Sequence, residues 1–243
     1  MWRIERLAET GSTNDDLAPR LGPEAAGVVR VAEVQTAGRG RRAGRRWIAP
    51  RGSGLLFTTA LPRPVAPSAL WCVTFWASLA IREAVRRACG VAPSLAWPND
   101  LLLDGRKCCG ILCVSRIQGS RAWVGVGSGV NVRRPDDASL TAAVEPPPAF
   151  LSDAAPAIDA ERLLESVLAV YDERLRDLDD PDGVARRWER DAQLDGTSYD
   201  VLVDGEHAPR RVVARSIAGD GSLVAEENGR VRTIALADAR VLR

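Results

Sequence analysis

The stretch VVRVAEVQTAGRGRRAGRRW, residues 28–47, joins a valine-rich segment to a loop in which glycine and arginine alternate. The β-branched residues of segment 28–34 predict a strand. In the loop, glycine lets the backbone approach a ligand, and arginine offers a planar cation that suits phosphate and carboxylate groups. No acidic residue occurs between Val34 and Arg82, so nothing nearby in the sequence neutralises this charge. The stretch therefore predicts a strand that leads into an anion-binding loop, with a solvated basic loop as the alternative.

The chain contains 32 arginines but one lysine, Lys107. A lone lysine in such a chain indicates a site that needs a compact ammonium group on a flexible stem. Asp104 and Gly105 form a hairpin-turn signal between two apolar runs, so Lys107 is expected just inside a strand, where it would be well held. Composition alone leaves open that this lysine has no special role.

Composition bounds the class of protein. A chain of 243 residues with 46% hydrophobic residues, 27% charged residues and a net charge of +1 is typical of a globular protein. The balanced charge argues against bulk nucleic-acid binding. Five cysteines without a metal-binding spacing indicate reduced thiols and a cytoplasmic location. The longest apolar run, residues 70–81, is too short to span a membrane.

Periodicity divides the chain into two parts. Predicted helices cover residues 10–17, 68–88, 160–178 and a segment after 180, and predicted strands cover residues 28–34, 54–61, 94–97 and 121–132. Past residue 192, short strands alternate with Asp-Gly and Asn-Gly turns, which is typical of a small β-barrel. We therefore expect an α/β protein of the α+β type, with one domain over residues 1–192 and a second over residues 193–243. In the first predicted helix, Ser12, Thr13 and Asn14 are N-cap candidates, and capping alone would explain them.

Four stretches then occur in a known order: GSTND (11–15), EVQTAGRGRRAGRRW (33–47), WPNDLLLDGRKCCGIL (97–112) and VGSGVNV (126–132). Together they resemble the biotin protein ligases, which attach biotin to carboxylase carrier domains. The resemblance covers the whole chain and implies a mixed-sheet catalytic domain of the biotin/lipoate ligase type, followed by a small C-terminal SH3-like β-barrel. Because little sequence precedes Thr10, the monofunctional form without a DNA-binding domain is expected.

The resemblance implies a reaction in two steps. The carboxylate of biotin attacks the α-phosphorus of ATP and gives biotinyl-5'-AMP and pyrophosphate, and a lysine of a biotin carboxyl carrier domain then attacks the mixed anhydride. ATP and biotin are the implied substrates, and Mg²⁺ is expected with ATP although no ligand spacing shows a metal site. The carrier domain is the implied partner, and neither nucleic acid nor a membrane is expected. The oligomeric state is open, a homodimer included.

The resemblance also assigns roles to residues of this sequence. It implies that Lys107 and Arg39 are catalytic. The implied biotin-binding residues are Ser12, Thr13, Gln35, Gly38, Arg39, Arg41, Lys107 and Gly110. The implied nucleotide-binding residues are Arg41, Arg45, Trp47, Asn99, Asp100, Lys107 and Asn131. The chain departs from the family pattern by an inserted Ala43, by Ala96 where a lysine is common, and by Cys108 and Cys109 in place of an apolar pair.

Other readings stay open. A lipoate or octanoate ligase has the same catalytic fold, and sequence alone does not prove which ring a pocket accepts. A module that binds biotin or its adenylate without turnover is kept open by Ala96 and Ala43. Nucleic-acid binding by the arginine loop is disfavoured by the balanced charge and by the absence of an aromatic platform.

Overall fold

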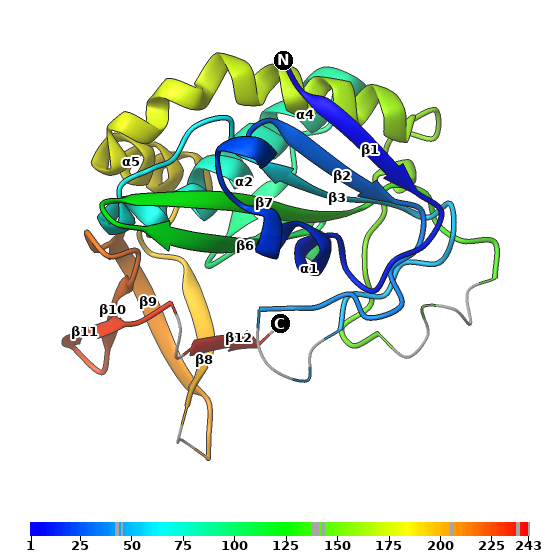
Figure 1. Ribbon diagram of the computed structural model, residues 1–243. Helices are drawn as coiled ribbons and strands as arrows, with labels where there is room; N and C mark the ends of the chain where they lie inside the picture. The colour runs from blue at the N-terminus through cyan, green and yellow to red at the C-terminus, as the bar shows by residue number, and fades with distance from the viewer. Residues whose placement is uncertain are drawn as a thin grey trace.

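The computed structural model describes residues 1–41, 44, 46–137, 141, 144–204, 207–236 and 239–242. In this part of the chain a seven-stranded sheet has the order β1-β2-β3-β7-β6-β5-β4, and a five-stranded antiparallel sheet has the order β11-β10-β9-β8-β12 (Figure 1). The expected α/β architecture with a C-terminal all-β unit is confirmed. The boundary after residue 192 remains a prediction.

The large sheet is mixed, because β1 pairs with β2 in parallel while its other strands pair in antiparallel fashion. Its strands are β1 (Arg3–Leu7), β2 (Val28–Ala32), β3 (Gly54–Ala60), β4 (Ser94–Ala96), β5 (Asp100–Leu103), β6 (Arg106–Gln118) and β7 (Arg121–Asn131). The sequence analysis missed β1, since this edge strand reads RIERL and lies partly in solvent. Its charges suit an edge, where they discourage pairing with another chain.

Helices cover one face of this sheet, and α1 lies on the other (Figure 1). The α-helices are α1 (Thr13–Leu17), α2 (Leu70–Cys89), α4 (Ala160–Arg174) and α5 (Pro181–Ala192). Short 3-10 turns occupy Ala18–Arg20, Pro23–Ala25, Pro67–Ala69, Leu151–Asp153 and Leu175–Asp179. α2 ends before Gly90, which has a φ of 75°, a conformation that glycine adopts without strain. Within the described residues, no helix has the length and apolar character needed to span a membrane.

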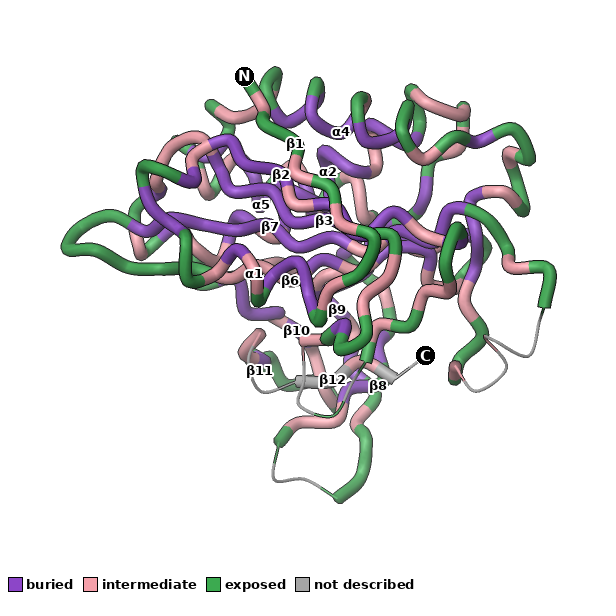
Figure 2. Tube along the Cα trace, turned by 45° about the vertical axis from the view of Figure 1, so that its right-hand side comes forward, coloured by how far each residue is buried: buried purple, intermediate pink, exposed green. Residues whose placement is uncertain are grey.

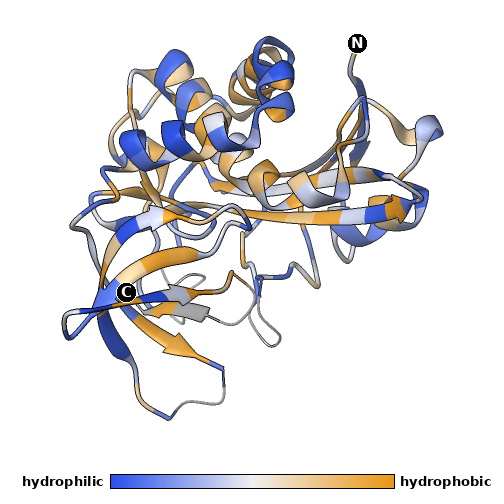
Figure 3. Cartoon of the chain, turned by 90° about the vertical axis from the view of Figure 1, so that its left-hand side faces the viewer, coloured by the Kyte–Doolittle hydropathy of each residue, from blue (hydrophilic) through white to orange (hydrophobic). Residues whose placement is uncertain are grey.

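The core lies between the helical layer and the sheet, where buried residues and apolar surfaces meet (Figures 2 and 3). Trp76 and Trp188 are almost fully buried there, and burying an aromatic side chain stabilises the fold by about 1.5–3 kcal/mol. Their polar atoms are satisfied, because Trp76 Nε1 donates to the carbonyl of Arg174 at 2.8 Å and Trp188 Nε1 donates to Ser78 Oγ at 2.9 Å. Trp76 and Trp188 therefore belong to the core without an unpaired polar atom.

The five cysteines are free thiols, as expected. Burial raises the pKa of Cys72 and of Cys108 to about 12, so both stay protonated at neutral pH. Within the described residues, no group of three or more histidine, cysteine, aspartate or glutamate side chains is placed to hold a metal ion.

The C-terminal strands are β8 (Ser198–Val203), β9 (Arg210–Ile217), β10 (Leu223–Glu227), β11 (Arg230–Ile234) and β12 (Ala239–Leu242). The sequence analysis predicted short strands in this part of the chain. The small sheet packs against the larger part of the chain, since Trp97 Nε1 donates to the carbonyl of Gly221 at 3.4 Å and hydrophobic residues of both parts form one core cluster.

Candidate active site

Lys107 lies where the sequence predicts it, one residue inside β6 after a tight turn. Asp104 and Gly105 have positive φ values of 50° and 73°, which is the backbone of an Asp-Gly hairpin. The ammonium group of Lys107 lies 2.7 Å from Asp100 Oδ1 on the neighbouring strand β5. The Asp100 side chain is 10% exposed, and that of Lys107 is 36% exposed. The Asp100 carboxylate therefore holds the ammonium group itself, which stays partly exposed.

The Trp47 ring packs closely against the backbone at two glycines, Gly110 of β6 and Gly129 of β7. A Cβ on Gly129 would lie 2.5 Å from Trp47 Cε2, and a Cβ on Gly110 would lie 3.0 Å from both Trp47 Cζ3 and Lys107 Nζ. Lys107 Nζ lies 5.4 Å from the indole centroid, within cation–π range. Trp47 Nε1 is buried, and no described residue accepts a hydrogen bond from it. Glycine is thus required at these positions by close approach.

Two cavities meet at Lys107 and Trp47. The larger has a volume of about 450 Å³ and reaches Asp100, Asn131 and Phe150. The smaller has a volume of about 60 Å³ and reaches the start of α1. Both are lined by Gly40, Arg41, Trp47, Asn99 and Lys107. An ammonium group at such a junction can contact one ligand from each side.

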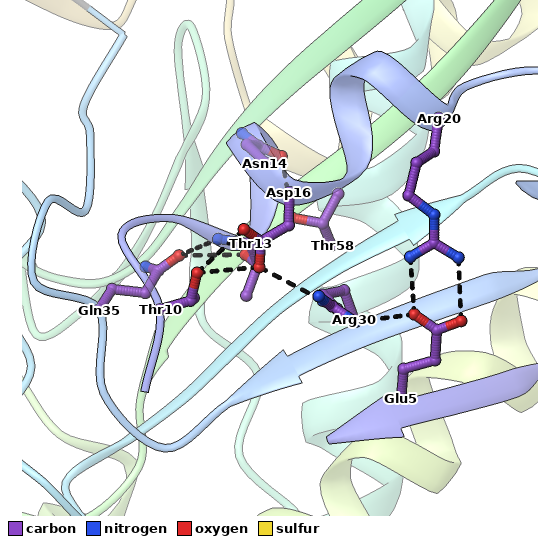
Figure 4. A network of polar contacts seen from close by, with 9 residues as sticks. All are labelled: Glu5, Thr10, Thr13, Asn14, Asp16, Arg20, Arg30, Gln35 and Thr58. Atoms are coloured by element: carbon purple, nitrogen blue, oxygen red, sulfur yellow. Dashed lines mark hydrogen bonds and ion pairs between the residues drawn. The ribbon is translucent and has the colours of Figure 1, made fainter. Parts of the chain in front are cut away.

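The far end of the smaller cavity is polar. Thr13 N donates to Gln35 Oε1 at 2.8 Å, so the start of α1 is joined to the segment after β2 (Figure 4). Ser12 occupies the N-cap position, yet its side chain makes no capping hydrogen bond. It is 3% exposed and lines the cavity. Ser12 is thus at the predicted N-cap position, but a side-chain capping bond does not explain it, and it lines the cavity instead.

The loop arginines have partners that the sequence did not predict. Arg39 forms an ion pair with Asp15 of α1, and Arg41 donates to the carbonyl of Leu236 from the C-terminal part. The idea of a cation without an acidic partner is thus corrected for Arg39, because Asp15 lies nearby in space although distant in sequence. Arg45 and the inserted Ala43 lie outside the described residues.

The structure brings most of the predicted site residues to these two cavities. They are Ser12, Thr13, Gln35, Arg39, Arg41, Trp47, Asn99, Asp100, Lys107, Gly110 and Asn131. Gly38 lines neither cavity. Its backbone lies against that of Trp47, since a Cβ there would lie 2.7 Å from the Trp47 carbonyl oxygen.

Sequence reasoning missed Asn14 and Phe150, which also line these cavities. Asn14 stands in the GSTND motif and was interpreted only as a cap candidate. Phe150 follows a proline-rich connection and carries no chemical signal of its own.

Comparison with known proteins identifies the family. Residues 6–131 match the model of the biotin/lipoate A/B protein ligase family. A biotin–[acetyl-CoA-carboxylase] ligase from Paracoccus denitrificans is 38% identical over 170 residues, which cover 68% of this chain and 70% of that protein. The chain belongs to this ligase family. A Mycobacterium tuberculosis protein of the same name is 37% identical over 152 residues, 57% of this chain and 55% of that protein.

A solved structure shows the same fold over both parts of this ligase-family chain. The biotin protein ligase from Aquifex aeolicus in complex with biotin and ATP aligns with a TM-score of 0.77 at 22% identity. The alignment covers 99% of this chain and 98% of that one. The family and the enzyme class, a ligase, are therefore confirmed as the sequence predicted.

Proposed function

We propose that this family member is a biotin protein ligase. In this proposal it activates biotin with ATP to biotinyl-5'-AMP and then transfers biotin to a lysine of a biotin carboxyl carrier domain. One observation carries the proposal: the only lysine of the chain lies at the junction of a small polar cavity and a larger one. The names of the Paracoccus and Mycobacterium relatives support the choice of biotin and of a carboxylase acceptor.

Lys107 has the chemistry that the first step needs. A biotin carboxylate that approaches the α-phosphorus of ATP brings two anions together, and a fixed cation between them lowers the barrier. The carboxylate oxygen forms a bond to phosphorus while the bond to pyrophosphate breaks, so pyrophosphate leaves with the electron pair. Asp100 holds the Lys107 ammonium on the side of the larger cavity. We assign the smaller cavity to the ring of biotin and the larger one to the nucleotide.

The larger cavity suits a nucleotide and its counter-ion. Asn131 Nδ2 donates to the carbonyls of Lys107 and Ala149 at 3.3 and 3.2 Å, which leaves its Oδ1 for other partners. Mg²⁺ is bound in proteins by one or two carboxylate or amide oxygens together with substrate phosphates and water. Asp100 and Asn131 offer such oxygens, so we propose that these residues would hold the Mg²⁺ ion of the ATP complex, which would neutralise phosphate charge.

Trp47 and the arginines around it would protect the intermediate. A mixed anhydride is hydrolysed by water, so a ligase must exclude water until the acceptor lysine arrives. Trp47 lies beside Lys107 between the cavities, and Arg41 contacts both cavities. We propose that Arg39 and Arg41 turn toward the phosphate and carboxylate groups once ligands are bound, and that Arg45 contributes from the same loop.

The transfer step is tested with a purified carrier domain. The protein is incubated with biotin, ATP and Mg²⁺, and biotinylation of the carrier is detected with avidin and by mass spectrometry. The carrier whose acceptor lysine is changed to arginine is the control and should stay unmodified. A lipoyl group on its own acceptor, with no biotin on the carrier, would transfer the assignment to the lipoate branch of the family. We also propose a cytoplasmic location, and the assembly, a homodimer included, stays open.

A further inference from the structure

The side chain of Asn14 spans the three central strands of the large sheet. Thr58 of β3 and Leu112 of β6 both pair with Gly127 of β7, so these three residues form one row across the sheet. Asn14 Nδ2 donates to the carbonyl of Leu112 at 3.0 Å, and its Oδ1 lies 2.9 Å from Thr58 Oγ1. A Cβ on Gly127 would lie 2.5 Å from Asn14 Nδ2. Glycine at the centre of the row makes room for this amide.

The same row is connected to the polar end of the smaller cavity. Thr58 Oγ1 lies 2.8 Å from Thr13 Oγ1, which in turn lies 3.1 Å from Gln35 Oε1 (Figure 4). Three of these residues are buried, with exposed fractions of 0% for Thr58, 3% for Thr13 and 6% for Asn14. A buried polar atom without a partner destabilises the fold. The protons of these hydroxyl groups are therefore strongly constrained.

Counting protons fixes their directions. Three oxygen–oxygen contacts connect Asn14, Thr58, Thr13 and Gln35, but the two hydroxyl groups supply only two protons. Asn14 Oδ1 is a carbonyl oxygen and can only accept, and the bond from Nδ2 to Leu112 fixes which end of the amide faces Thr58. The contact with Thr58 therefore requires the Thr58 proton. The 2.8 Å contact between the two hydroxyls then requires the Thr13 proton. Gln35 Oε1 does not need it, since it already accepts from Thr13 N.

We propose that Thr58 and Asn14 are positioning residues that make the Thr13 hydroxyl a hydrogen-bond acceptor toward the smaller cavity. Thr13 gives its proton to Thr58, and Thr58 gives its proton to Asn14. The lone pairs of Thr13 Oγ1 then face the cavity without a competing proton. The opposite direction, in which Thr58 donates to Thr13, would leave Asn14 Oδ1 buried beside an oxygen that offers it no proton.

This arrangement would select the chemical class of the ligand, and the inference rests on the proposed function. A fixed acceptor at the end of the cavity rewards a ligand with an N–H donor and rejects one without it, because the buried acceptor would stay unpaired. The cyclic urea of biotin carries two N–H groups, whereas the dithiolane ring of lipoate carries none. Thr58 and Asn14 thus contribute to the preference for a cyclic urea without touching it.

The experiment compares Thr58→Val with Thr59→Val. Both threonines are 0% exposed on β3, but side chains alternate along a strand, so Thr59 faces away from Thr13. Within the described residues, Thr59 Oγ1 has no hydrogen-bond partner. Dissociation constants are measured calorimetrically for biotin and for biotin analogues methylated at one or the other ureido nitrogen. Thermal unfolding of each variant shows whether it is folded.

We expect the wild-type chain and Thr59→Val to bind biotin alike and to prefer it by about tenfold or more over the analogue whose methylated nitrogen faces Thr13. Thr58→Val should weaken biotin by about tenfold and reduce this preference to within about threefold, because the Thr13 proton is no longer fixed. Thr58→Ser keeps the hydroxyl and should restore both. Gly127→Ala displaces the Asn14 amide and should have the same effect as Thr58→Val.

Two results would overturn the proposal. In one, Thr58→Val binds biotin as Thr59→Val does. In the other, Thr58→Val weakens biotin and both analogues equally, which indicates a purely structural role. A wild-type chain that binds no biotin at all would instead overturn the proposed function, and the inference with it.

Discussion

Lys107 is fixed by a carboxylate on a neighbouring strand, at the junction of the two cavities. Its ammonium lies 2.7 Å from Asp100 and 5.4 Å from the Trp47 ring centroid. The nearest free space is narrow, because a Cβ on Gly110 would lie 3.0 Å from Lys107 Nζ. A wider guanidinium would have to displace the indole or leave the junction of the cavities.

Lys107→Arg should therefore lower the rate of biotin adenylation by about tenfold or more, the scale of removing one oriented charge in a transition state. The rate is measured as exchange of pyrophosphate into ATP. Arg106→Lys is the matched control, because Arg106 precedes Lys107 on β6 and its closest acid, Asp153, lies 3.9 Å away. That variant should exchange at the wild-type rate. Equal rates for Lys107→Arg and the wild type would refute the argument from the single lysine.

The sequence predicts the place and role of some site residues but not of others. Lys107 is conspicuous among 32 arginines, and a hairpin signal places it correctly. Thr58 carries no such signal, because threonine in an apolar strand is an ordinary strand former. Its partner Asn14 lies 44 positions away in the sequence, so only the fold brings the two together.

At the scale of elements, β7 is the strand against which Asn14 and Trp47 pack. Its glycines leave room for Asn14 over Gly127 and for Trp47 over Gly129. Helices α2, α4 and α5 and the long strands could be predicted from periodicity and turn signals. β1 and β12 could not, since one is a charged edge strand and the other a four-residue strand.

Gly129→Ala should displace the Trp47 indole and weaken biotin binding by about tenfold or more, because a packed aromatic ring and a new methyl group cannot share one volume. Binding is measured by titration calorimetry. Gly219→Ala is the control, because an added Cβ there would meet no atom within 4 Å. Wild-type affinity in Gly129→Ala would show that the position of Trp47 does not depend on a glycine at residue 129.

Glu5 of strand β1 forms ion pairs with Arg20 and with Arg30 of β2. The Arg20 guanidinium, which hydrogen-bonds to this carboxyl group at 2.8 Å, lowers its pKa from 4.5 to about 2, and the charge of Arg30 contributes further. A pKa lowered by folding stabilises the protein above the unfolded pKa, and this stabilisation is lost as the pH falls from about 4.5 to about 2.

We expect Glu5→Gln to lower the free energy of unfolding at pH 7 by about 1 kcal/mol, a modest value because the pair lies near solvent. The same variant should show a flatter loss of stability between pH 4.5 and pH 2. Urea unfolding across this range measures both effects. Glu24→Gln is the control, since no described residue forms an ion pair with the Glu24 carboxylate, and an equal flattening there would contradict the assignment to Glu5.

At the scale of the whole molecule, two sheets share one core. Hydrophobic residues from both parts belong to a single cluster, and Gly221 of the C-terminal part packs against Trp71 of α2. Periodicity predicted two units, because the pattern of strands and turns changes near residue 192. It could not predict their packing or the strand order of the large sheet, which depend on contacts between segments remote in the sequence.

Because the core is continuous, we expect one cooperative thermal transition rather than two. Gly221→Ala should lower its midpoint by several degrees, since Gly221 has a φ of 84° and an added Cβ would lie 3.1 Å from Trp71 Cβ. Scanning calorimetry measures both. Gly219→Ala is the control, because a Cβ there meets no atom within 4 Å. Two separate transitions would show that the parts unfold independently.

The central claim is that the two cavities bind biotin and ATP on either side of Lys107, and pyrophosphate exchange tests it most directly. The purified protein is given ATP, Mg²⁺ and labelled pyrophosphate with biotin, with lipoate or with no acid. The account predicts exchange that depends on biotin and is absent with lipoate and without an acid. Exchange with lipoate alone, or none with either acid, would contradict it.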